Sequence, residues 1–214
     1  MVDQRVYAKQ QSASRFSDDT WVNLRASRDG SPIIMPWYVA LAIEGRVYQV
    51  RLGTITAPLT GDIEITTVAA ESAAEAAAGS TIIPLYVNVD LEALGGTLPQ
   101  ACFKSVNALI TTLGTAFVPL NLRIGGPAAS GRAAVAAAGG VAVAAESNTT
   151  TRVLASGHTS GIGDAQPNLL DQQFRYPNVL VGPASIYLQV GTVMTGSDYF
   201  AFYNYAELLT NDIT

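Results

Sequence analysis

The segment near the C-terminal end, residues 198–209 ("DYFAFYNYAELL"), has the alternation of a β-strand but carries apolar or aromatic side chains on both faces. The two faces are formed by Phe200, Phe202 and Leu208 and by Tyr199, Tyr203 and Tyr205. A strand with one face in water alternates apolar with polar residues. Both faces of this strand therefore need a cover. We expect the phenylalanine face to fill a core and the tyrosine face to form an interface between subunits.

Short β-rich segments separated by turn residues dominate the first half of the chain. They run over residues 20–27, 33–45 and 46–56, with turns predicted at 28–30 and 44–45. The full sequence predicts roughly ten short strands with at most one or two short helices. We therefore expect an all-β fold, a two-layer antiparallel β-sandwich, with a jelly roll as its form. Residues 21–214 are expected to form this single domain, and residues 1–20 an N-terminal arm or the first strand.

Three later segments carry more specific expectations. Residues 67–80 are rich in alanine, place two glutamates four apart and end at a glycine, which favours a short helix. Residues 133–147 contain the pair Gly139 and Gly140, which predicts a hairpin. Residues 156–177 are polar and glycine-rich and predict a long surface loop.

Charge is sparse along the whole chain. Charged residues make up 14% of the sequence, against roughly 25% in soluble proteins, so we expect other subunits to cover part of the surface. The formal net charge is −5 and the basic residues form no run, which disfavours nucleic-acid binding. The longest apolar runs, 33–43 and 133–145, are shorter than the ~20 residues that cross a bilayer. We expect no membrane contact.

Few residues offer chemistry. His158 is the single histidine and lies in "SGHTSG", without a nucleophile-elbow pattern. Cys102 alternates with Phe103 and is expected to face the core. Asp62 with Glu64 could form a calcium or glycosidase pair, although solvated charges explain them as well. We therefore expect no catalytic residue, no metal and no cofactor.

Two further features point to partners. The N-terminal segment spaces the apolar residues Val6, Tyr7 and Phe16 among polar ones, as in an arm that orders against a neighbouring protein. An ordinary first strand of the sandwich is the alternative. The tryptophans, Trp21 and Trp37, together with the nine tyrosines, could offer a platform for stacking a sugar ring, although core and interface packing also explain these aromatic residues.

An acidic chain with one cysteine and few lysines, built of short strands rich in Ala, Val and Thr and ending in "YFAFYNYAEL", resembles the jelly-roll structural proteins of virions. It is most similar to the trimeric decoration, or cement, proteins of tailed phages. The resemblance lies in composition and strand rhythm and transfers no functional residue. It implies a non-enzymatic homotrimer that is made in the host cytoplasm and binds the major capsid protein on the capsid surface. A capsid shell subunit and a carbohydrate-binding β-sandwich module remain as alternatives.

Overall fold

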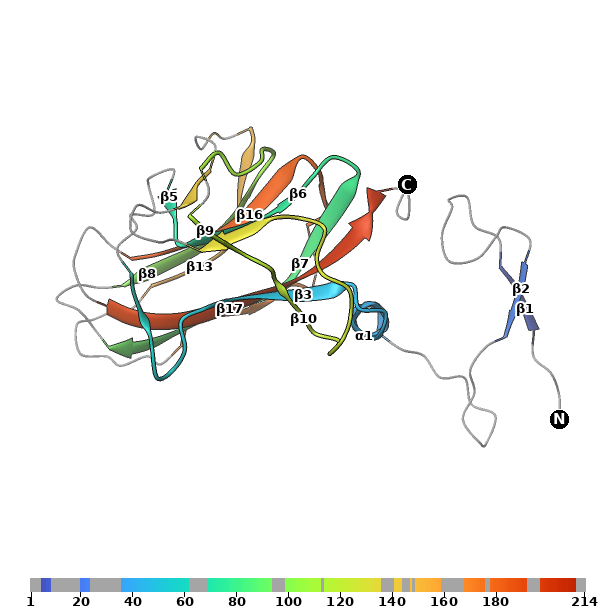
Figure 1. Ribbon diagram of the computed structural model, residues 1–214, viewed down its shortest axis with the longest axis horizontal. Coiled ribbons are helices and arrows are strands. Elements are labelled where there is room, and N and C mark those ends of the chain that lie inside the picture. The colour runs from blue at the N-terminus through green and yellow to red at the C-terminus, as the bar shows by residue number, and fades with distance from the viewer. Residues whose placement is uncertain are drawn as a thin grey trace.

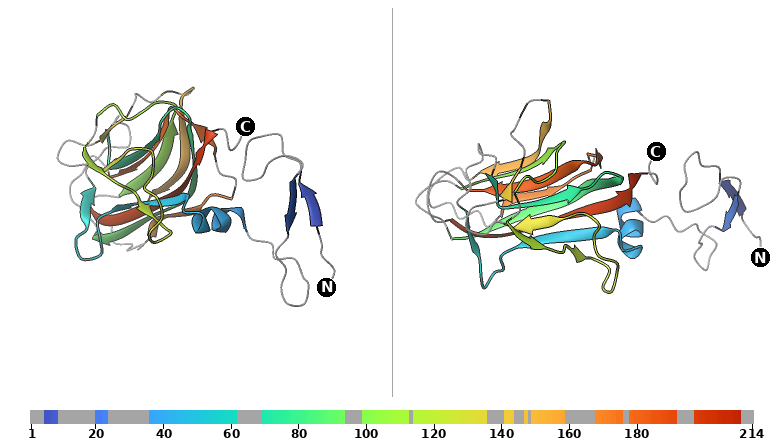
Figure 2. Two further views of the ribbon diagram at one scale, coloured as in Figure 1. Left: turned by 45° about the vertical axis from the view of Figure 1, so that its right-hand side comes forward. Right: turned by 45° about the horizontal axis from the view of Figure 1, so that its top comes forward.

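The computed structural model describes residues 5–8, 20–23, 36–61, 69–93, 99–112, 114–135, 141–143, 147, 149–158, 168–175, 178–191 and 197–210. Most of these residues form strands of two antiparallel sheets, which lie face to face (Figures 1 and 2). The prediction of an all-β, two-layer antiparallel sandwich is confirmed.

The first sheet has, in order, β10 (Leu120–Asn121), β3 (Val47–Leu52), β17 (Ser197–Leu209), β7 (Ser80–Ala93) and β14 (Asn168–Gln173). Two short strands extend it: β15 (Leu180–Val181) pairs with β7, and β4 (Leu59–Gly61) pairs with β17. The second sheet has, in order, β13 (Thr151–His158), β8 (Gln100–Val106), β16 (Ala184–Val190), β6 (Ser72–Ala76), β11 (Ala133–Val135) and β9 (Thr115–Phe117). A small pair joins β12 (Val141–Ala142) to β5 (Ala69–Ala70).

Eight of these strands are paired in a nested order. The first, β3, pairs with the last, β17, and β6 pairs with β16. Inside them β7 pairs with β14, and β8 with β13. All four pairs are antiparallel, so the chain from β3 to β17 folds back on itself like one long hairpin whose successive strand pairs alternate between the two sheets.

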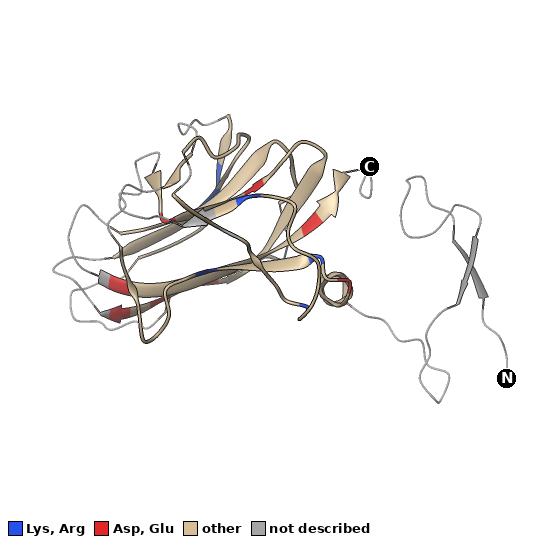
Figure 3. Cartoon of the chain, viewed as in Figure 1, with Lys and Arg blue, Asp and Glu red and all other residues tan. Residues whose placement is uncertain are grey.

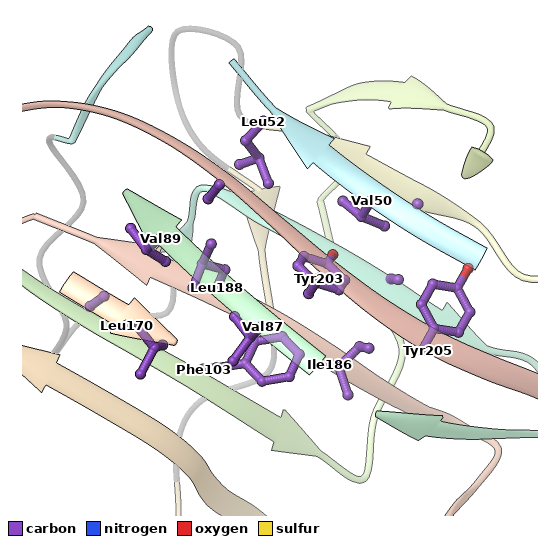
Figure 4. Close-up of a cluster of buried hydrophobic side chains, with 14 of the residues drawn as sticks. Val50, Leu52, Val87, Val89, Phe103, Leu170, Ile186, Leu188, Tyr203 and Tyr205 are labelled. Carbon is purple, nitrogen blue, oxygen red and sulfur yellow. The ribbon is translucent and has the colours of Figure 1, made fainter. Parts of the chain in front are cut away.

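The core lies between the sheets and is built from alternate residues of their strands. In β3 the side chains of Tyr48, Val50 and Leu52 are buried, while Gln49 and Arg51 face outward. This is the alternation that the sequence predicts for residues 47–52. Figure 4 shows the centre of the cluster. Its fully buried members include Val50, Leu52, Val87, Val89, Phe103, Ile186, Leu188, Tyr203 and Tyr205.

Residues 37–43 form a helix, so the expectation of a β-rich segment there is wrong. The helix α1 (Trp37–Ile43) follows Pro36 and contains the good helix formers Ala40, Leu41 and Ala42. Its buried residue Leu41 packs with Val47 on the outer face of the first sheet. The turn at residues 44–45 is present, but it joins this helix to β3 instead of closing a hairpin.

Residues 69–76 form strands β5 and β6, so the predicted helix over 67–80 is also wrong. All five residues of β6 are buried, and β6 is paired on both sides, by β16 and β11. The hydrogen bonds to these two neighbouring strands satisfy the backbone of β6, and its small alanine side chains leave room for the opposite sheet. Tertiary packing here overrides the helical preference of alanine.

The hairpin predicted in residues 133–147 is not formed by the described strands of that segment. Strand β11 pairs with β6 and β9, whereas β12 pairs with β5. The two glycines of the predicted turn, Gly139 and Gly140, lie outside the described residues.

The predicted loop over 156–177 is in part β-structure: β13 continues to His158, and β14 occupies Asn168–Gln173. β13 and β14 are edge strands of the second and the first sheet, so the backbone of each pairs with one neighbouring strand. Polar side chains of these strands, such as those of Ser156 and Gln172, are exposed to water.

The N-terminal strands form a two-stranded ribbon. β1 (Arg5–Ala8) pairs antiparallel with β2 (Thr20–Asn23), and Tyr7 stands opposite Trp21. Within the described residues, the ribbon does not pair with either large sheet, and it lies apart from the sandwich in Figures 1 and 2. Val6 and Tyr7 belong to β1, whereas Phe16 lies outside the described residues. The role of this segment in binding a partner stays a prediction.

Candidate functional site

The two faces of β17 are the reverse of those expected from the sequence. Tyr199, Tyr203 and Tyr205 are 0%, 0% and 1% exposed and belong to the core, so their assignment to a subunit interface is wrong. The opposite face, with Phe200, Phe202 and Leu208, is half-buried and points away from the second sheet.

These tyrosines fit the core because neighbouring residues of both sheets provide ring contacts and, for some of them, a hydrogen bond to the hydroxyl. The Tyr203 ring centroid lies 5.1 Å from that of Phe103 on β8. The Ser72 hydroxyl of β6 donates to the Tyr203 hydroxyl over 3.4 Å. Tyr48 and Tyr205 pair at 5.9 Å between centroids, and the Tyr48 hydroxyl donates to the Ala128 carbonyl. Tyr203 and Tyr48 thus bury a ring whose hydroxyl has a hydrogen-bond partner, which is stabilising. The Tyr205 hydroxyl is buried without such a partner among the described residues, so Tyr205 contributes through its ring alone.

We expect these tyrosines to make folding sensitive to alkaline pH. Desolvation by burial raises the pKa of Tyr203 and Tyr205 above the usual value, whereas tyrosines in an unfolded chain ionise near pH 10, roughly. The neutral rings thus stabilise the fold fully below pH ~10, and this contribution is lost as the pH rises toward the folded-state pKa values.

A tyrosinate absorbance titration measures this effect, with the same titration in denaturant as the control. Fewer than the nine tyrosines should ionise at the usual pH in the folded protein. Ionisation of all nine with the unfolded profile would contradict the buried positions.

The residues considered for catalysis do not converge. His158 is exposed at the end of β13, opposite Gln100 on β8. Cys102 is 4% exposed and therefore buried, but the residues on either side of it in β8, Ala101 and Phe103, are the ones that belong to the core. Because successive strand residues face opposite ways, Cys102 lies on the other face of β8, and the prediction that it faces the core is wrong.

Asp62 and Glu64 lie outside the described residues. Among the residues that the structure does describe, no three His, Cys, Asp or Glu side chains gather as metal ligands, and no helix is long and apolar enough to cross a membrane.

Two buried glutamates hold the segment that precedes β11, a feature that the sequence analysis missed. Glu207 of β17 accepts hydrogen bonds from the backbone N–H groups of Ser130 and Gly131 at 3.0 and 3.1 Å. Glu75 of β6 pairs with the Arg132 guanidinium and accepts the Ile110 N–H at 3.0 Å. The segment is therefore fixed to both sheets. A lone acid among apolar residues, as at Glu207 in "YNYAELL", was the available signal.

A row of exposed aliphatic side chains lies in the same connection, between β9 and β11. We name it the aliphatic row: Val118, Leu120, Leu122 and Ile124 are 64%, 56%, 44% and 100% exposed. Figure 3 shows few charged residues along this part of the chain. Four large apolar side chains at alternate positions, all in water, are unusual on a surface that nothing covers.

The backbone under the aliphatic row is fixed by polar contacts. The Asn121 amide donates to the carbonyls of Gly45 at 2.8 Å and Pro127 at 2.7 Å. The Leu122 N–H donates to the Val47 carbonyl at 3.0 Å. The apolar side chains are therefore presented by a held segment beside β3.

A groove of about 530 Å³ lies next to the aliphatic row, between α1 and the outer face of the first sheet. Trp37, Tyr38, Val39 and Ala42 of α1 form one side, and Gln173, Phe174 and Arg175 at the end of β14 contribute as well. The sheet adds Val47, Leu85, Tyr86 and Asn204, and Leu122 completes the lining. Of the two tryptophans considered as sugar platforms, Trp37 lines this groove and is 45% exposed, while Trp21 lies in β2.

Comparison of the chain with known proteins finds no matching family model, no matching curated protein and no matching solved structure.

Proposed function

We propose that this chain is a non-enzymatic structural protein of a virion, which forms a homotrimer and decorates the outer surface of a capsid by binding its major capsid protein. The observation that carries the proposal is the aliphatic row, because it is a fixed apolar surface that requires a partner. The sparse charge of the chain, 14% of residues, suits a protein whose surface is shared with neighbours.

The strand order supports a jelly roll as the form of the sandwich. In a jelly roll, a long hairpin of eight strands wraps into two sheets of four. The nested pairs β3–β17, β6–β16, β7–β14 and β8–β13 have this order. Jelly rolls build many viral capsid proteins and also lectins. The link to virions is thus an analogy at the level of the fold, whereas the partner surface is argued from this chain's own residues.

We expect a negative charge placed in the aliphatic row to disrupt either the homotrimer or its binding to the capsid. Leu120→Glu and Ile124→Glu each put a carboxylate where a partner's apolar surface should lie, and burying an unpaired charge is strongly unfavourable. Light scattering should give about three times the 22.4 kDa chain mass for the parent protein. If the aliphatic row lies between copies of the chain, the variants should give a smaller mass than the parent protein. If it faces the capsid, the variants should keep the trimer mass but no longer co-sediment with capsids that lack the protein.

Val153→Glu is the matched control, because Val153 is 62% exposed on β13 of the second sheet. It should leave both mass and co-sedimentation unchanged. A parent protein that is monomeric and does not bind capsids would refute the proposal. If the protein does assemble or bind, unchanged behaviour of Leu120→Glu and Ile124→Glu would remove the aliphatic row from the interface.

A further inference from the structure

We propose that the groove between α1 and the first sheet binds a saccharide that carries a carboxylate group. This is a second binding function, separate from the attachment to a capsid. It follows from three properties of the lining: exposed aromatic rings, planar polar side chains, and a single charge of positive sign.

Two aromatic rings of α1 form one side of the groove, and both are exposed to solvent although large aromatic side chains are usually buried. Trp37 and Tyr38 are 45% and 41% exposed, and their rings meet edge to face with centroids 6.2 Å apart. Because the two rings are nearly perpendicular, at 86°, they offer surfaces in two directions. The C–H face of a sugar ring is apolar and stacks on such aromatic surfaces, which contribute large contact areas at low conformational cost.

The sheet supplies a third aromatic ring that is held in place. The Tyr86 hydroxyl donates to Asp171 at 2.6 Å, and the Tyr86 ring lies 5.6 Å from that of Phe202. Desolvation by burial, followed by the hydrogen bond to Asp171, raises the pKa of Tyr86 to about 12. Tyr86 is therefore a fixed wall of the groove and stays protonated near neutral pH.

The polar part of the lining suits hydroxyl groups. Asn204 and Gln173 carry amides, which donate and accept hydrogen bonds in one plane. The Asn204 Oδ1 accepts from the Gln49 amide at 3.1 Å, which fixes the orientation of the Asn204 side chain and leaves its amide nitrogen as a donor. A sugar presents many hydroxyls that can both donate and accept, whereas an apolar peptide would leave these amides without partners.

The charge of the lining selects an acidic sugar. Arg175 is its one charged side chain, and the lining contains no Asp or Glu. Arg175 has no ion-pair partner among the residues that the structure describes. The chain as a whole has a net charge of −5, so an anionic ligand needs a local cation to approach. A guanidinium binds a carboxylate through two parallel hydrogen bonds.

The groove also has a suitable size. Its volume of about 530 Å³ lies within the roughly 300–1,000 Å³ of small-ligand sites. The occupant would be a monosaccharide or a short oligosaccharide, with its ring against Trp37 or Tyr38 and its carboxylate at Arg175.

The test is a calorimetric titration of the full chain with two acidic probes, trigalacturonic acid and 3′-sialyllactose. Their neutral counterparts, maltotriose and lactose, are titrated in parallel. We expect at least one acidic probe to bind, and to bind more tightly than its neutral counterpart. Trp37→Ala should weaken its binding about tenfold or more, since stacking on one aromatic ring contributes on the order of 1.4 kcal/mol. Arg175→Gln should remove the preference for the acidic probe.

Arg152→Gln and Val153→Ala are the controls, because both positions are exposed on β13 of the other sheet. They should bind like the parent chain. Circular dichroism of each variant confirms that it is folded. Leu120→Glu and Ile124→Glu should keep sugar binding even where they abolish assembly, so the two proposals fail separately.

Three results would overturn the inference: neither acidic probe binds, the neutral sugars bind as tightly as the acidic ones, or Trp37→Ala and Arg175→Gln bind like the parent. A change in the mass of the assembly in Trp37→Ala, without any sugar binding by the parent chain, would instead assign the groove to a contact between copies.

Discussion

Replacing Tyr203 with alanine is expected to lower the free energy of unfolding by about 3–5 kcal/mol, the range for removing a large aromatic side chain from a core. Tyr203 is 0% exposed and joins the two sheets, since its ring meets Phe103 and its hydroxyl accepts from Ser72. The substitution leaves a cavity between the sheets and removes the partner of the Ser72 hydroxyl. Denaturant unfolding followed by tryptophan fluorescence measures the loss.

Phe202→Ala is the matched control, because Phe202 is the next residue of the same strand and faces outward. It is half-buried and contacts Tyr86, so we expect a smaller loss of about 1–2 kcal/mol. A larger loss for Phe202→Ala than for Tyr203→Ala would restore the orientation of β17 that the sequence suggested.

This pair of residues shows what alternation can and cannot predict. The two-residue period of segment 198–209 correctly predicted a strand, although only one of its faces is fully buried and the other is half-buried. The phase of the alternation was not determined, because both faces are apolar and a shift by one residue exchanges them. In residues 47–52, where Gln49 and Arg51 mark the wet face, the same reasoning gave the correct orientation.

Segments without clear alternation were assigned from local preference, and several of these assignments differ from the structure; two of them are instructive. Residues 72–76 became a buried strand because β6 has partners on both sides. Residues 37–43 became a helix because Leu41 could pack on the outer face of the first sheet. Both outcomes depend on neighbours that are distant in sequence, which a local pattern does not contain.

The candidate surfaces were predictable only in part. Trp37 stood out in the sequence, and it does line the groove. Its companions Tyr86, Arg175 and Asn204 come from three separate strands or strand ends, and only the strand order brings them together. For the aliphatic row, the alternation in residues 118–124 was visible, but whether it faced the core or the solvent depended on the position of β10 at the sheet edge.

The second large effect is expected at Gly157, where the two sheets meet at one edge. Gly157 lies in β13 and pairs with Ala101 of β8, while its other side approaches β14 of the first sheet. A Cβ atom at this position would lie 1.9 Å from the carbonyl oxygen of Leu169. Backbone cannot yield as a flexible side chain does, so Gly157→Ala has to force the edge strands β13 and β14 apart.

We expect Gly157→Ala to lower the free energy of unfolding by about 3 kcal/mol, the upper part of the range for overpacking. The neighbouring change Ser156→Ala is the control. Ser156 is exposed on the same strand, so its loss should stay within about 0.5 kcal/mol. Hydrogen exchange locates the effect: amide protons of β13 and β14 should exchange faster in Gly157→Ala, while those of β16 and β6, in the middle of the second sheet, should change only as much as the global stability does. Equal stability of the two variants would show that the sheets do not touch at this edge, and the glycine would then serve only the loop that the sequence suggested.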